Sequence, residues 1–226
     1  MKSPRPLLVT WVYRRLLLAL TLASAASLAQ AGRPLAVDDA NTNDKGAGHV
    51  EMWATQSSVA GDPVVYNVSP AYAPIDGLEL AATWSRPNDG TDATSSAQLK
   101  WRITESQEQG CNFGAVLGMA RAPVDVDTTY IIALFSCNAA ASGSMHINLG
   151  AYKTKGANDS VNTWGVAFEH PMDSVTPHIE WFGEENAEPT VQVGLRGQIT
   201  KTLQLDGSIG RTTDVTLYTL GLKIQF

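Results

Sequence analysis

The stretch Thr216-Leu217-Tyr218-Thr219-Leu220-Gly221-Leu222-Lys223-Ile224-Gln225-Phe226 ends the chain, and its side chains alternate in character. One face carries Tyr218, Leu220, Leu222, Ile224 and Phe226, whereas the other carries Leu217, Thr219, Gly221, Lys223 and Gln225. A period of two predicts a β-strand. The apolar face runs to the carboxy terminus and holds two aromatic side chains about a bilayer's thickness apart, which is typical of a strand that faces lipid.

This ending resembles the C-terminal signature of bacterial outer-membrane barrels, in which alternate apolar residues precede a terminal Phe. The resemblance implies that the stretch is the closing strand of a transmembrane β-barrel. It also implies that the barrel-assembly machinery recognises the chain through this strand, and that the barrel sits in outer-membrane lipid.

The N-terminal residues 1–31 have the three parts of a secretory signal peptide. Basic residues come first, an apolar run follows over 16–28, and Ala29-Gln30-Ala31 fits the small-residue cleavage pattern. A membrane-anchoring helix is the alternative, but the run is shorter than the ~20 residues that a span requires. We therefore expect export and cleavage after Ala31.

The charge of the chain argues against a nucleic-acid partner. The formal net charge is −6, and the signal segment removes four basic residues and no acidic ones, so the mature chain carries −10. An acidic exported protein repels phosphate backbones. No later stretch reaches the ~18 consecutive apolar residues of a membrane helix, as expected of barrel strands, which are apolar only at alternate positions.

Residues 32–48 are polar and show no period, with Asp38, Asp39 and Asp44 close together. We interpret them as a solvated periplasmic lead-in between the signal peptide (1–31) and the barrel (49–226). Their carboxylates match no calcium-loop spacing, and no motif in the chain predicts a metal or another cofactor.

From residue 49 onward, segments of alternating polarity are separated by turn signals. The fold class is therefore all-β, an antiparallel transmembrane β-barrel with twelve strands, an even number that returns both termini to one side. Pro70 makes the second strand the least regular. The expected strands cover residues 50–55, 64–72, 78–85, 97–104, 112–120, 129–137, 145–153, 163–169, 175–182, 190–199, 203–210 and 216–226.

Connections are expected to alternate between short periplasmic turns and longer outer loops. Short ones cover 73–77, 170–174 and 200–202, whereas 86–96, 154–162 and 183–189 are longer. The outer set would form an acidic rim, although acidic loops also serve solubility alone. That set consists of Asp62, Asp89, Asp92, Asp125, Asp127, Asp159, Glu184, Glu185, Glu188 and Asp214.

The two cysteines fall on adjacent expected strands. If that hairpin is symmetric about Val124, Cys111 faces Cys137 and Phe113 faces Phe135, within disulfide range. An oxidising location favours a structural disulfide, with two free thiols as the alternative. Neither cysteine belongs to a redox or metal motif.

If the apolar faces meet lipid, the polar faces line a lumen. The side chains that we expect to act there as an electrostatic filter are Lys100, Arg102, Glu180, Arg196 and Lys223. Eight strands enclose a filled interior and sixteen an open channel, so a barrel of twelve leaves both an open and a plugged lumen possible. A one-residue slip in a strand would exchange its faces.

Two stretches resemble a particular family. The N-terminal stretch is Arg33-Pro34-Leu35 with Asp38-Asp39-Ala40 and residues 48–53, and the C-terminal stretch runs from residues 191–196 through 203–206 to Gly221-Leu222. Both are similar to the outer-membrane transporter-like proteins of the meta-pathway phenol degradation family. Val37 replaces a usual hydroxyl residue, and residues 74–77 match the usual turn only loosely. The resemblance implies a barrel that takes up hydrophobic or aromatic compounds, and it supplies no catalytic residues.

The sequence thus favours a passive channel for small-molecule solutes and not an enzyme. The alternatives are a closed structural or surface-interaction barrel, an outer-membrane lipid hydrolase, and a soluble exported β-sandwich or lipocalin-like protein. His146 and His178 are the residues that a hydrolase would use, but no nucleophile motif accompanies them.

Overall fold

The computed structural model describes residues 35–107, 109–122, 126–139 and 143–226. The predicted signal peptide and its cleavage after Ala31 lie outside this part of the chain. No helix in the described ranges is long and apolar enough to cross a membrane.

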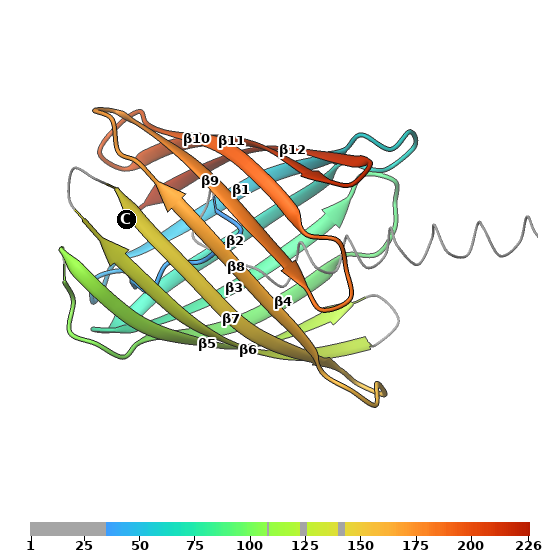
Figure 1. The fold of residues 1–226 in the computed structure, drawn as a ribbon, viewed down its shortest axis with the longest axis horizontal. Helices are drawn as coiled ribbons and strands as arrows, with labels where there is room; N and C mark the ends of the chain where they lie inside the picture. Colours follow the sequence, from blue (N-terminus) through green and yellow to red (C-terminus); the bar gives the residue numbers. More distant parts are fainter. Residues whose placement is uncertain (1–34, 108, 123–125, 140–142) are drawn as a thin grey trace, which may run out of the picture.

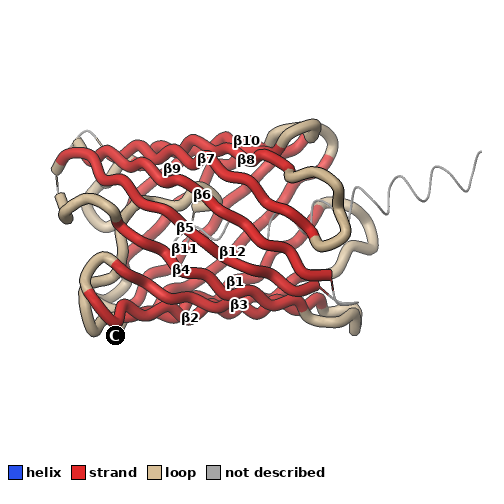
Figure 2. The backbone as a smooth tube through the Cα atoms, turned by 90° about the horizontal axis from the view of Figure 1, so that it is seen from below, coloured by secondary structure: helices blue, strands red, loops and turns tan. Residues whose placement is uncertain are grey.

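Twelve antiparallel strands form one closed barrel, in which each strand pairs with its neighbours in sequence and β1 also pairs with β12 (Figures 1 and 2). This confirms the predicted fold class and strand number. The strands are β1 Gly48–Ser57, β2 Val65–Ile75, β3 Leu78–Pro87, β4 Thr94–Arg102, β5 Gly110–Ala122, β6 Val126–Asn138, β7 Ser144–Thr154, β8 Val161–Glu169, β9 Val175–Glu184, β10 Thr190–Gln198, β11 Leu203–Thr212 and β12 Val215–Gln225.

The closing strand of the prediction is the strand that closes the barrel. β12 pairs with β1 from Ser57 opposite Leu217 to His49 opposite Gln225. Beyond the ladder, the amides of Gly48 and Phe226 each donate to the other residue's carbonyl at 2.9 Å. Closure therefore leaves no open sheet edge, the condition that a strand in lipid must meet.

The barrel is apolar outside and polar inside. Outward side chains such as Leu220, Trp101 and Trp181 are more than half exposed, whereas inward ones such as Lys100, His146 and Glu180 are buried. A surface covered with exposed large apolar side chains is stable only against a non-aqueous phase. The outer face therefore has the character of a lipid-facing surface, and the apolar faces of the strands point outward as the alternation predicted.

The irregularity of β2 lies next to Pro74 and not at Pro70, where the sequence predicted it. Pro70 points outward, and between β2 and β3 the register shifts between Tyr72 and Ile75, next to Pro74. A proline lacks the N–H that a ladder needs, so the irregularity falls where the sequence lacks donors. The strand nevertheless pairs on both sides, with β1 and with β3.

The β5–β6 hairpin has the predicted register, with Cys111 opposite Cys137 and Phe113 opposite Phe135. The two cysteines form a disulfide, and the two phenylalanine rings lie 4.8 Å apart. Because Phe113 is half exposed on the same strand face, the bridge lies on the outer surface of the barrel.

The two ends of the barrel differ in charge more than in loop length. Gly48 and Phe226 lie at what we call the terminal end, with the turns at 76–77, 170–174 and 199–202. The described acidic residues of the predicted rim belong to connections at the opposite loop end or to strand residues beside them. The expected contrast in length is weak, because residues 103–109 form a long connection at the terminal end and 213–214 a short one at the loop end.

The outward face can be tested at Leu220, the most exposed apolar side chain near the middle of β12. We expect Leu220→Arg to destabilise the barrel by about 2–4 kcal/mol, because a cation would enter the lipid-facing band near its middle. Urea unfolding of the refolded protein in lipid vesicles measures this. Thr219→Arg is the control, because Thr219 faces inward, and an equal loss from both changes would contradict the assigned faces.

The disulfide can be tested by unfolding the oxidised protein beside Cys111→Ser/Cys137→Ser. The bridge joins residues 26 apart in sequence. Its loss should lower the free energy of unfolding by about 3 kcal/mol, chiefly because the unfolded chain gains freedom. The variant should still show heat-modifiable migration on a gel, since the ladder alone fixes the hairpin register. An unchanged unfolding midpoint would show that the bridge does not constrain the unfolded chain.

Candidate functional site: a lumen divided by the N-terminal segment

Residues 35–43, which we call the lumen segment, lie inside the barrel. We expected this stretch to be a solvated lead-in, and that interpretation was wrong for these residues: Val37 and Ala40 are buried at 1% and 0% exposure, and Asp38 is buried with them. Twelve strands enclose more space than their inward side chains fill, so a further part of the chain can enter.

Side chains of the barrel wall hold the backbone of this segment. A carboxylate oxygen of Glu180 accepts the N–H groups of Ala36 and Val37. Asn148 accepts the N–H of Asp38 at 2.7 Å and donates to its carbonyl at 2.8 Å. These contacts satisfy backbone groups that would otherwise be buried without partners, a condition that costs about 1–3 kcal/mol per group.

Further anchors follow along the segment. The hydroxyl of Ser136 accepts the N–H of Ala40 at 2.8 Å, and Glu79 accepts the N–H of Asn43 at 2.9 Å. The acceptors come from strands around the barrel, from β3 to β9. The segment therefore crosses the lumen and is held on several sides.

Glycines in the wall make room for the segment. A Cβ added to Gly165 would lie 2.7 Å from Cγ2 of Val37, and one added to Gly114 would lie 3.3 Å from the carbonyl oxygen of Ala40. Val37 packs with Leu35 against Ala167, and Phe182 lies against this cluster. The wall is thus shaped to the segment at two separate places.

Charged side chains of the wall and of the lumen segment also pair with each other. Lys100 donates to Asp38 at 2.8 Å, and its ammonium lies 3.8 Å from Asp39. Both members of the Lys100–Asp38 pair are buried, so each depends on the other, because a single buried charge is strongly unfavourable.

The five residues predicted to form a filter all have partners. Lys100 and Glu180 contact the lumen segment, as described. Arg102 lies 3.0 Å from Asp76, Arg196 lies 2.9 Å from Glu169, and Lys223 lies 3.2 Å from Glu51. Sequence reasoning brought these residues to one lumen but missed Asp38 as a partner, because it placed residues 35–43 outside. The signal for it was local: Leu35 and Val37 are apolar within a polar stretch.

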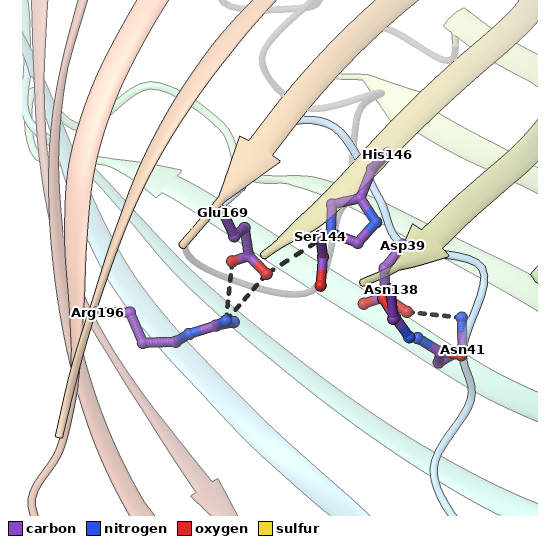
Figure 3. Close-up of a pocket in the computed structure, with 7 residues that line it drawn as sticks. All are labelled: Asp39, Asn41, Asn138, Ser144, His146, Glu169 and Arg196. Atoms are coloured by element: carbon purple, nitrogen blue, oxygen red, sulfur yellow. Dashed lines mark hydrogen bonds and ion pairs between the residues drawn. The ribbon is translucent and has the colours of Figure 1, made fainter. Parts of the chain in front are cut away.

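A cavity of about 370 Å³ lies on the terminal side of the segment. Figure 3 shows its lining: Asp39 and Asn41 come from the segment, and His146, Glu169 and Arg196 project from the wall, with the guanidinium of Arg196 directed at the Glu169 carboxylate. Asn138 and Ser144 complete it. The lining is almost wholly polar, as suits a water-filled space.

His146 lies in a buried polar cluster beside the lumen segment. Its Nδ1 lies 2.7 Å from the hydroxyl of Ser136, and its Nε2 lies 3.6 Å from Glu169. A serine, a histidine and a carboxylate therefore adjoin, but Ser136 is fully buried and its oxygen already accepts the N–H of Ala40. A substrate cannot reach that oxygen while the segment is in place.

A second cavity of about 810 Å³ lies on the loop side. Residues of the lumen segment line this cavity on the side toward the terminal end, and residues 184–188 and 212–215 line it at the loop end. Inward aromatic side chains, among them Trp53, Tyr152 and Phe182, share its wall with carboxylates. Within the described ranges, no group of three or more histidine, cysteine, aspartate or glutamate side chains is placed to hold a metal ion.

Comparison with protein families assigns the chain to one family. Residues 17–226 match the family described as "Uncharacterised conserved protein UCP029691". The chain belongs to this family. The match does not confirm the resemblance to the meta-pathway phenol degradation family. No curated protein matches the chain.

Solved structures of porins and channels share the fold of this family member. A KdgM porin has a TM-score of 0.69 at 9% identity, over 79% of this chain and 99% of its own. A NanC porin has a TM-score of 0.63 at 9% identity, over 77% and 98%. The COG4313 outer membrane channel from Pseudomonas putida F1 has a TM-score of 0.58 at 15% identity, over 83% and 98%. At these identities the similarity is one of fold.

The anchoring of the segment can be tested by labelling a cysteine placed at Val37 with a water-soluble maleimide. Cys111 and Cys137 are bonded to each other and do not compete. Adding Glu180→Ala to Val37→Cys should speed labelling at least tenfold, because hydrogen bonds to a charged acceptor contribute about 1.5–3 kcal/mol.

Ser208→Ala is the matched control for that experiment, since Ser208 is another buried inward residue and its hydroxyl has no hydrogen-bond partner among the described residues. This change should leave the labelling rate of Val37→Cys as it is. Equal rates in the Glu180→Ala and Ser208→Ala backgrounds would refute the anchoring role of Glu180.

Proposed function

We propose that the protein is an outer-membrane barrel that acts as a passive channel for small molecules, with the lumen segment closing it at rest. The observation that carries the proposal is the division of one lumen into two cavities by residues 35–43. Across Ala36–Asn43, side chains and not the barrel's backbone ladder accept the N–H groups described above.

The topology of this arrangement permits a movable barrier. Leaving the lumen would break the side-chain hydrogen bonds, each with a net contribution of about 0.5–1.5 kcal/mol or more where an acceptor is charged, and also the buried Lys100–Asp38 ion pair. The ladder that closes the barrel would stay intact. A segment that enters without joining the sheet can therefore move without unfolding it.

Displacement would also change the charge of the lumen. Asp38 and Asp39 would leave with the segment, so Lys100 would lose both of its partners. Lys100, Arg102, Glu180, Arg196 and Lys223 would then act as the electrostatic filter of the open channel.

Location and partners belong to the same proposal. The apolar outer face supports an environment of outer-membrane lipid, and the C-terminal strand supports recognition by the barrel-assembly machinery. The predicted signal peptide, cleaved after Ala31, would deliver the chain. Small solutes, including hydrophobic or aromatic ones, are the proposed cargo, because aromatic side chains line the larger cavity.

The ligand of one structural neighbour is not carried over. A KdgM porin has been solved in complex with disordered oligogalacturonate. That compound bears a carboxylate on each sugar, whereas eight carboxylates already line the larger cavity here. A polyanion would meet like charge.

A closed structural or surface-interaction barrel is the second candidate. Its support is the pairing of the lumen charges, which is what a barrel without transport requires. A lipid hydrolase has no comparable support, because the sequence around Ser136 carries no nucleophile motif.

Single-channel conductance in planar bilayers tests the channel. A variant that lacks residues 35–43 should give steps several-fold larger or more frequent than the full-length protein, because the barrier between the two cavities is gone. Glu180→Ala/Asn148→Ala should increase the frequency of opening without changing the size of a full step. Ser208→Ala should behave like wild type.

Heat-modifiable migration of each variant on a gel shows that the barrel has folded before conductance is compared. A folded, inserted barrel that never conducts, even without residues 35–43, would contradict the channel and leave the closed barrel. Steps of one size and frequency in every variant would contradict the gate.

A further inference from the structure

The loop-side cavity has the dimensions of a binding site. Its volume of about 810 Å³ lies within the range of small-molecule pockets, about 300–1,000 Å³. Residues of the lumen segment line it on one side, and at the loop end its lining reaches the connections after β9 and β11. In the resting protein it is therefore a cup that a solute reaches from the loop end.

Charge in this cup is one-sided. Eight carboxylates and two lysines line it, and both lysines are already paired, Lys100 with Asp38 and Lys223 with Glu51. Toward the loop end the described lining contains Glu184, Glu185, Glu188 and Asp214 and no lysine or arginine. A concave wall of low dielectric concentrates such a field, which draws in cations and repels anions.

The wall of the cup offers a second, apolar kind of contact. Trp53, Tyr152 and Phe182 project inward from β1, β7 and β9 and are only partly buried. The Tyr152 hydroxyl donates to Glu184 at 2.9 Å, so an aromatic ring adjoins a carboxylate. Aromatic faces hold apolar groups and also attract organic cations.

Together these observations define a ligand class that neither feature defines alone. A bare metal ion would not use the aromatic wall, and a neutral aromatic compound would not use the carboxylates. We propose that the loop-side cavity binds organic cations with an apolar body, such as aromatic amines, and excludes anions. The inference names the substrate class of the channel and rests on the proposed function, with this cavity as its outer vestibule.

Binding of three probes of similar size and different charge tests the proposal: benzylammonium, benzyl alcohol and benzoate. Titration calorimetry on the refolded full-length protein in a non-ionic detergent at neutral pH and low salt gives each affinity. Benzylammonium should bind at least tenfold more tightly than benzyl alcohol, and benzoate should not bind. Added salt should weaken the binding of benzylammonium selectively, because screening acts on the charge alone.

A triple variant that replaces three carboxylates of the cavity by neutral amides shows whether the preference for benzylammonium comes from the cavity. Glu184→Gln/Glu188→Gln/Asp214→Asn should reduce the preference for benzylammonium over benzyl alcohol at least fivefold. The matched control is Asp89→Asn/Asp92→Asn/Asp159→Asn, which changes net charge equally at exposed loop residues outside the cavity lining. This control should keep the wild-type preference.

Three outcomes would overturn the inference: equal affinity for the three probes, tighter binding of benzoate, or an equal loss of preference in both triple variants. Failure of the proposed function looks different. A barrel that binds benzylammonium but never conducts would contradict the channel and keep the binding site. A barrel that conducts without any preference among the probes would keep the channel and contradict the site.

Discussion

Closing twelve strands into a cylinder encloses more space than the inward side chains fill, and the rest of the molecule depends on this constraint. An interior of that width either admits water along its length or receives another part of the chain. Here the lumen segment enters, and its buried backbone groups must find partners. Glu180 and Asn148 are buried because they are those partners. The polar side chains of the interior are therefore suited to contact with the backbone of the lumen segment as well as with water.

The fold followed from local pattern. Strand number, face assignment and the register of the β5–β6 hairpin all rest on a period of two and on turn signals, which act between residues near in sequence. The pairing of Cys111 with Cys137 is of this kind, because a hairpin of known centre determines every opposite pair. The irregular part of β2 was expected at Pro70, but the register shifts next to Pro74.

Only the wall residues of the site, and not their contacts with the lumen segment, could be predicted from the sequence. Lys100 and Glu180 each lie on the polar face of an alternating strand, so the sequence could assign them to the interior. Their contacts with residues 36–38 were not predicted, because a polar stretch without a hydrophobic period gives no signal that it enters the barrel. Glu180 and Val37 are 143 residues apart. Residues so far apart in sequence come together only when the barrel closes, and a pattern within a short window of sequence cannot predict that contact.

The lumen segment is continuous with β1, and only residues 44–47 separate them. A segment on so short a tether stays near its seat when it is released, at an effective concentration in the millimolar range. Return to the lumen is then a unimolecular event whose rate does not depend on how much protein is present. A free peptide of the same sequence would compete for the seat only above that concentration. In the proposed channel, this connectivity would act together with the anchors to favour return to the closed state.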